Sequence, residues 1–110
     1  MILIGDVWFA MFPLEEDNSR FISRPVIILD AARLEVLVVK VTKSAPRSND
    51  KYDIPIIYWQ YADLKFKSTA RVAKSILLDR SQLEFKIGAL HPIDLANIES
   101  AFIQFVTEDR

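Results

Sequence analysis

Three polar side chains stand within or at the ends of otherwise apolar segments, namely Arg24, Thr42 and Arg71. Arg24 directly precedes a proline and a β-branched run, and a charge in such a place either pairs with a carboxylate or binds an anion. Both interpretations are open. If residues 26–29 and 34–42 form an antiparallel hairpin, Arg24 lies opposite Thr42. Two guanidinium groups and a hydroxyl at one point suit a phosphodiester, because they bind its oxygens and stabilise a phosphorane-like transition state.

The sequence offers few other groups for catalysis. Its single histidine, His91, precedes a proline at a predicted helix start, where a capping or surface role is the better interpretation. With no cysteine and no carboxylates at ligand spacing, we expect no metal and no other cofactor. Cleavage without a metal requires a substrate that carries its own nucleophile, and RNA has one in its 2′-hydroxyl. The chemistry therefore favours RNA over DNA, although no histidine lies on these strands to accept the proton.

Length and composition indicate one domain over residues 1–110, with a single core. No apolar run approaches the roughly 18 residues of a membrane span, so we expect no membrane association. The apolar start Met1–Ile4 follows no basic region and is not a secretory signal. Together with the absence of cysteine, this predicts a cytoplasmic protein. A net charge of −1 excludes an overall electrostatic footprint for nucleic acid, but a local basic patch can still bind a short single strand.

Apolar and β-branched runs predict strands over residues 6–12, 26–29, 34–42, 52–58 and 69–78. The first of these strands is apolar on both faces, which places it inside a sheet. The fourth contains Pro55 and is expected at a sheet edge.

Helical signals follow the strands. Residues 59–64 are expected to form one helical turn. Ser81 and Glu84 have the spacing of a capping box, which predicts a short helix over residues 82–87 that ends at Gly88. A final helix starts at Pro92, and its apolar stripe comprises Leu95, Ile98, Phe102 and Phe105. Several short strands and one late helix predict a small, strongly bent antiparallel sheet or barrel.

Two loops are polar enough to be binding loops or solvated connectors. Residues 13–23 include Arg20, and residues 43–51 form a basic segment that we expect to be mobile. We predict that these loops guide an RNA strand, through the side chains of Arg20, Lys43, Ser44 and Arg47.

Four segments occur in a distinctive order along the chain: Gly5-Asp6-Val7-Trp8-Phe9, Arg24-Pro25-Val26-Ile27-Ile28, a strand ending Val41-Thr42-Lys43, and a late strand from Arg71-Val72 to Asp79. In this order the chain resembles the PemK/MazF family of toxins, over nearly its whole length. The resemblance implies a mainly β fold with a C-terminal helix, that is, a small SH3-like antiparallel barrel of the CcdB/PemK/MazF type. It also implies a homodimer that cleaves single-stranded RNA without metal and is inhibited by a cognate antitoxin.

The resemblance also assigns roles to residues. Arg24 is similar to the catalytic arginine of the family motif, Thr42 to the threonine that contacts the scissile phosphate, and Arg71 to the second arginine of the PemK branch. In that branch an aspartate two residues after the second arginine acts as base, and here that position is Ala73.

Two alternatives to the nuclease stay open. One is a relative that has lost cleavage and acts as a protein- or RNA-binding module, which Ala73 favours. The other is a gyrase-poisoning toxin of the same fold, which acts through an apolar, aromatic C-terminus, whereas this chain ends in the polar segment Thr107–Arg110. A pocket of cations would attract an acidic, partly disordered antitoxin segment, so we expect antitoxin and RNA to compete for one site.

Overall fold

A computed structural model of the chain describes residues 1–108. Its elements in chain order are β1 (Asp6–Pro13), β2 (Phe21–Ala31), β3 (Glu35–Thr42), β4 (Asp53–Ile56), β5 (Ser68–Asp79), a short 3₁₀ helix η1 (Arg80–Gln82), β6 (Leu83–Ala89) and α1 (Pro92–Glu108). The predicted mainly β fold with a C-terminal helix is confirmed.

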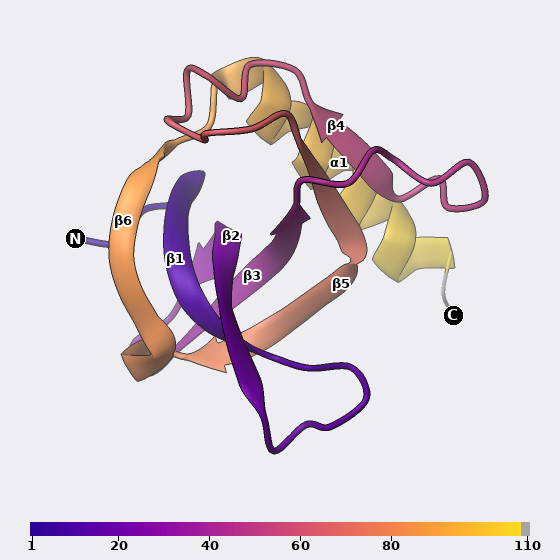
Figure 1. Cartoon of the computed structure of the whole chain (residues 1–110). Helices are drawn as coiled ribbons and strands as arrows, with labels where there is room; N and C mark the ends of the chain where they lie inside the picture. The colour runs from indigo at the N-terminus through magenta and orange to yellow at the C-terminus, as the bar shows by residue number, and fades with distance from the viewer. Residues whose placement is uncertain (109–110) are drawn as a thin grey trace.

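The six strands form one antiparallel sheet in the order β4-β5-β3-β2-β1-β6. The sheet bends strongly, so that its ribbons curl around a common axis (Figure 1). β1 lies inside the sheet and β4 lies at its edge, as the sequence predicted. Pro55 is tolerated in β4 because only one side of an edge strand pairs with a neighbour.

Both faces of the central strands β2 and β3 are buried, because side chains alternate along each strand and both sets are apolar. Ile27 and Leu29 of β2 pack into one cluster that includes the helix residue Ile98. Val26 and Ile28 of the same strand pack into a second cluster, which contains no residue of α1. This arrangement explains the continuous apolar run of β2.

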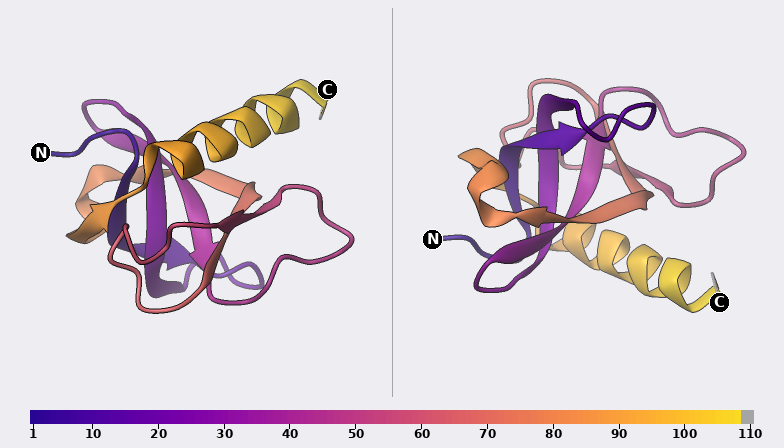
Figure 2. Two further views of the ribbon diagram at one scale, coloured as in Figure 1. Left: turned by 90° about the horizontal axis from the view of Figure 1, so that it is seen from above. Right: turned by 90° about the horizontal axis from the view of Figure 1, so that it is seen from below.

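Helix α1 crosses one side of the sheet, and its C-terminal end extends in the same direction as the loop between β3 and β4 (Figure 2). His91 caps the helix: its Nδ1 accepts a hydrogen bond from the Ile93 amide at 3.1 Å, which agrees with the predicted capping role. Asp94 is buried, and its two oxygens accept hydrogen bonds from the Ile57 amide at 2.9 Å and the Tyr58 amide at 2.8 Å. The first turn of α1 is therefore fixed to the end of β4.

The short helix predicted over residues 82–87 is wrong, because Leu83–Ala89 is strand β6 and pairs with β1. A capping box is present, but it is formed by Asp79 and Gln82 instead of Ser81 and Glu84. It caps only the single 3₁₀ turn Arg80–Gln82. Pairing with β1 and the stacking of Phe85 on Phe9 outweigh the local helical preference of this segment.

Residues 57–63 form consecutive turns and no regular helix, and Asp63 has a left-handed backbone with φ of 62°. In the part of the chain that the structure describes, no helix has both the length and the apolar character required to cross a membrane.

Candidate active site

Arg24 lies near the start of β2, between β1 and β3. The antiparallel β2–β3 register pairs Val26 with Lys40. Continued by two residues toward the start of β2 and the end of β3, this register places Arg24 opposite Thr42, as the predicted hairpin requires. Its Nη1 donates a hydrogen bond to the main-chain oxygen of Val41 at 3.4 Å. The Nε of Arg24 is buried and has no hydrogen-bond partner within residues 1–108. Buried donors are normally satisfied, so this guanidinium is available to an anion.

Arg24 and Thr42 line one cavity of about 620 Å³, which we call the main cavity. It opens between the ends of β2 and β3, the loop before β5, and β6. Its aromatic walls include Phe9 and Phe85, whose rings stack with centroids 5.2 Å apart. Cationic side chains at the cavity are Arg24, Lys43, Lys65 and Lys86. Such a mixture of cations and apolar rings is suited to a nucleic acid, in which phosphates alternate with bases.

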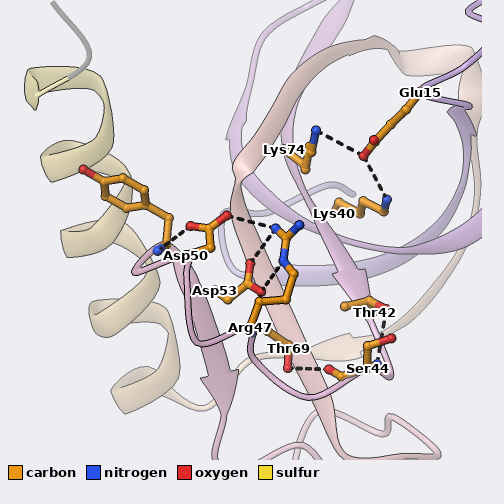
Figure 3. Close-up of polar contacts among 10 residues, drawn as sticks. Glu15, Lys40, Thr42, Ser44, Arg47, Asp50, Asp53, Thr69 and Lys74 are labelled. Carbon is orange, nitrogen blue, oxygen red and sulfur yellow. Dashed lines mark hydrogen bonds and ion pairs between the residues drawn. The ribbon is translucent and has the colours of Figure 1, made fainter.

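The Thr42 hydroxyl is held by the loop that follows β3 (Figure 3). Its Oγ1 accepts a hydrogen bond from the Ser44 amide at 3.2 Å, and the Ser44 main-chain oxygen accepts one from the buried Thr69 hydroxyl at 2.8 Å. Because the Thr42 oxygen acts as acceptor in this contact, its hydroxyl hydrogen can be donated to a phosphate oxygen.

Arg71 lies on β5, directly across from Lys40 of β3. It does not line the main cavity, but it is close enough to act on Arg24 electrostatically. The pKa of Arg24 is lowered from its ordinary value, chiefly by burial and then by repulsion from Arg71, while Glu15 opposes this shift. The structure therefore brings Arg24 and Thr42 to one cavity, with Arg71 beside it.

The four residues predicted to guide RNA do not all lie at the main cavity. Lys43 lines the main cavity, and its Nζ lies 5.2 Å from the centroid of the Phe66 ring. Ser44 lines a neighbouring hollow of about 420 Å³ between the β3–β4 loop and the end of β4, which Lys43 also borders. Arg20 is exposed at the end of the β1–β2 loop.

Arg47 is already paired with carboxylates of its own loop region (Figure 3). Its Nε lies 2.9 Å from Asp53 Oδ2, and its Nη2 lies 2.9 Å from Asp50 Oδ2. Burial would raise the pKa of Asp53, but the hydrogen bonds from Arg47 outweigh burial and hold this pKa below its ordinary value. Arg47 thus shapes the loop that the sequence suggested was mobile.

Three residues beside the site were missed by sequence reasoning: Glu15, Lys40 and Lys74. Lys40 pairs with Glu15 at 3.7 Å, and Lys74 pairs with the same carboxylate at 3.1 Å. Lys40 shares a strand face with Thr42, and this alternation is a signal that could have identified it. Glu15 lies in the β1–β2 loop and Lys74 in an irregular part of β5. Local sequence patterns do not predict the positions of side chains in such segments.

Across residues 1–108, no three His, Cys, Asp or Glu side chains gather in a way that could hold a metal ion. The main cavity is lined by cations, hydroxyls, aromatic rings and one carboxylate, that of Asp63.

Comparison of the sequence with models of known families identifies the family of this chain. Residues 4–106 match the family model for the PemK-like, MazF-like toxin of type II toxin–antitoxin systems. The chain belongs to this family. The resemblance seen in the order of its motifs is confirmed, and the match extends over both Arg24 and Arg71.

Solved structures of similar proteins show the same fold. MazF of Deinococcus radiodurans superposes with a TM-score of 0.73 at 16% sequence identity, covering 94% of each chain. The toxin MazF-mt6 of Mycobacterium tuberculosis gives 0.70 at 16% identity, covering 90% of this chain and 93% of its own. An endoribonuclease from Mycobacterial species, in complex with its cognate antitoxin, gives 0.72 at 14% identity, covering 97% and 96%. No curated protein matches the sequence significantly.

Proposed function

We propose that this PemK/MazF-family toxin is a metal-independent endoribonuclease that cleaves single-stranded RNA. The observation that carries the proposal is the buried Nε of Arg24, which has no partner among the described residues and belongs to a guanidinium that lines the main cavity with Thr42. Two solved structures with this fold are those of endoribonucleases from Mycobacterial species.

The proposed reaction uses the nucleophile of the substrate. The 2′-oxygen of one ribose attacks the adjacent phosphorus, the bond from phosphorus to the 5′-oxygen breaks, and the products carry a 2′,3′-cyclic phosphate and a 5′-hydroxyl. The proton that leaves the 2′-hydroxyl is matched by the proton that the 5′-oxygen gains, so no co-reactant is consumed. Ala73 has no group that accepts a proton and takes no part in the reaction.

In this scheme Arg24 and Arg71 stabilise the negative charge that develops on the phosphate, and Thr42 orients it by donating a hydrogen bond. Lys43, Ser44 and Arg20 guide the strand along the cavity and its neighbouring hollow, and Arg47 acts by holding the β3–β4 loop in shape. The exposed ring of Phe85 is available to stack on a base.

The proposal extends to partners. A cognate antitoxin would cover the main cavity with an acidic, partly disordered segment, since the cavity offers cations for its carboxylates and aromatic walls for its apolar anchors. We propose a cytoplasmic homodimer, and exposed apolar side chains such as Leu77 and Phe21 are available to its interface. An antitoxin peptide and RNA should then exclude each other. Simultaneous binding without mutual weakening would argue against a shared site.

Incubation of the purified protein with a long single-stranded RNA in EDTA tests the activity. We expect cleavage by the parent and none by Arg24→Ala. Arg33→Ala is the matched control, because Arg33 lies in the turn between β2 and β3, at the opposite end of these strands from the site. Intact RNA with the parent would favour the non-cleaving binding module, which the alanine at position 73 supports.

A further inference from the structure

Four cations gather beside the main cavity around one carboxylate. The cations are Arg24, Lys40, Arg71 and Lys74, which we call the cation cluster, and the carboxylate is that of Glu15. Glu15 Oε1 lies 3.1 Å from the Lys74 Nζ and 3.7 Å from the Lys40 Nζ, and its side chain reaches between the two amines (Figure 3).

An irregularity in the sheet produces this concentration of charge. The β3–β5 register pairs Val39 with Ser75 but the next residue, Lys40, with Arg71. Residues 72–74 therefore fall between these two pairs and have no partner on β3. In a regular ladder only Lys74 would face Lys40, whereas the shift places Arg71 opposite Lys40 and keeps Lys74 nearby.

Glu15 does not neutralise the cluster. The pKa of Lys40 is lowered, first by burial and next by the charge of Arg24, with Arg71 and Lys74 adding to the shift against the opposing effect of Glu15. The Nε of Arg71, like that of Arg24, is buried without a partner in the described part of the chain. Asp53 is opposite Arg71 in the β4–β5 register and the two charges interact, but the hydrogen bonds of Asp53 go to Arg47. The cluster therefore has capacity for a second anion.

Glu15 lies on the solvent side of Lys40. It belongs to the loop between β1 and β2, which is closed at its base by a hydrogen bond of 2.9 Å from the Leu14 amide to the Arg20 oxygen. The Glu15 side chain is 54% exposed, whereas the Lys40 side chain is 13% exposed. An exposed carboxylate on a loop can withdraw, but the strand-borne cations are fixed by the sheet.

We propose that the cation cluster is a second phosphate site, and that Glu15 occupies it until a phosphate of bound RNA displaces the carboxylate. Arg24 and Thr42 hold the scissile phosphate in the main cavity, on which the charge of Arg71 also acts, and Lys40 and Lys74 hold a neighbouring phosphate. Glu15 thus acts as an internal competitor of RNA. This inference rests on the proposed function, because it needs a strand lying in the main cavity.

Binding of a 2′-O-methyl single-stranded RNA tests the inference, since this probe lacks the nucleophile and is not cleaved. We expect Glu15→Gln to tighten binding by about three- to fivefold, the range of a partly exposed ion pair. Glu16→Gln is the matched control: it removes the same charge from the same loop, and within residues 1–108 Glu16 makes no ion pair. Lys40→Met and Lys74→Met should each weaken binding and reduce its salt slope by about 1.

A double-mutant cycle separates a local contact from a general charge effect. In the Lys40→Met/Lys74→Met background, Glu15→Gln should tighten binding no more than Glu16→Gln does. Equal gains for Glu15→Gln and Glu16→Gln in the parent, with RNA cleavage intact, would overturn the second phosphate site alone. Failure of the parent both to bind the probe and to cleave RNA would overturn the proposed function and this inference together. Circular dichroism melts verify that each variant is folded.

Discussion

Arg24 lies near the start of β2 and Thr42 at the end of β3, and both side chains line the main cavity. The register that pairs Val26 with Lys40 places the two opposite each other when it is continued by two residues. Arg24 supplies a positive charge and Thr42 a neutral hydroxyl, so the contributions of the two side chains to cleavage can be tested separately.

Thr42→Val removes the hydroxyl and keeps the shape of the side chain. If Thr42 donates to the phosphate in the transition state, cleavage should fall by about 100- to 1000-fold while RNA affinity changes little. Thr42→Ser should restore most of the rate. Single-turnover cleavage and binding of an uncleavable strand measure the two effects. A valine variant that cleaves as fast as the parent would remove Thr42 from the mechanism.

Asp94 fixes α1 to the end of β4 through the amides of Ile57 and Tyr58. Asp94→Ala would leave both amides without a partner, and we expect it to lower the free energy of unfolding by about 2–4 kcal/mol. Asp94→Asn keeps one acceptor oxygen, so its free energy of unfolding should lie between those of the parent and Asp94→Ala. Urea denaturation measures both, with Glu99→Ala as the control on the exposed side of the same helix. Equal stabilities for Asp94→Ala and the control would contradict this role.

Gly88 allows β6 to approach the turns at residues 59–64. A Cβ at this position would lie 2.4 Å from the main-chain oxygen of Ala62, so Gly88→Ala must push the two segments apart. We expect a loss of about 1–3 kcal/mol in the free energy of unfolding. Cleavage should fall as well, because Asp63 and Leu64 of this segment line the main cavity. Ala89→Ser, at an exposed position of the same strand, is the control; if it destabilises as much, the close approach is not the cause.

Glu108 joins the end of α1 to the loop before β4. A hydrogen bond from Lys51 and then one from the Tyr52 hydroxyl lower the pKa of Glu108 to about 2. The pKa is lower in the folded state than in the unfolded chain, so the stabilisation is complete above the unfolded value and is lost as the pH falls toward the folded value. Between about pH 5 and about pH 2, the melting temperature of Glu108→Gln should therefore fall less than that of the parent. Glu99→Gln serves as the control, and identical pH profiles for parent and Glu108→Gln would show that the contact adds no stability.

Much of the fold could be predicted because the position of some strands follows from local signals. The two apolar faces of β1 and the proline of β4 indicated an interior and an edge position, and both are correct. The exception is β6, where Ser81 and Glu84 mimic a helix start. Pairing with β1 and the stacking of Phe85 on Phe9 decide that segment, and a local pattern does not contain these long-range contacts.

The candidate site also has a part that could be predicted from the sequence and a part that could not. A hairpin has one register, so the approach of Arg24 to Thr42 followed from the spacing of two strands. The pairing of Arg47 with Asp53, and the position of Glu15 between Lys40 and Lys74, depend on loops that fold back over the sheet. Charge patterns in the sequence indicated basic loops but not the carboxylates that pair with them.

The shift in the β3–β5 register has a consequence for how this toxin can diverge. Residues 72–74 lie outside the ladder with β3. Val72 is fully buried in the core and its amide donates a hydrogen bond to the Tyr52 oxygen, whereas Ala73 and Lys74 are only partly buried. Exchanges at these last two positions would alter the charge presented to RNA without repacking the interior. Ala73 lies within this segment, and the loss or gain of an acid there is accordingly a change that evolution can make at little cost to the scaffold.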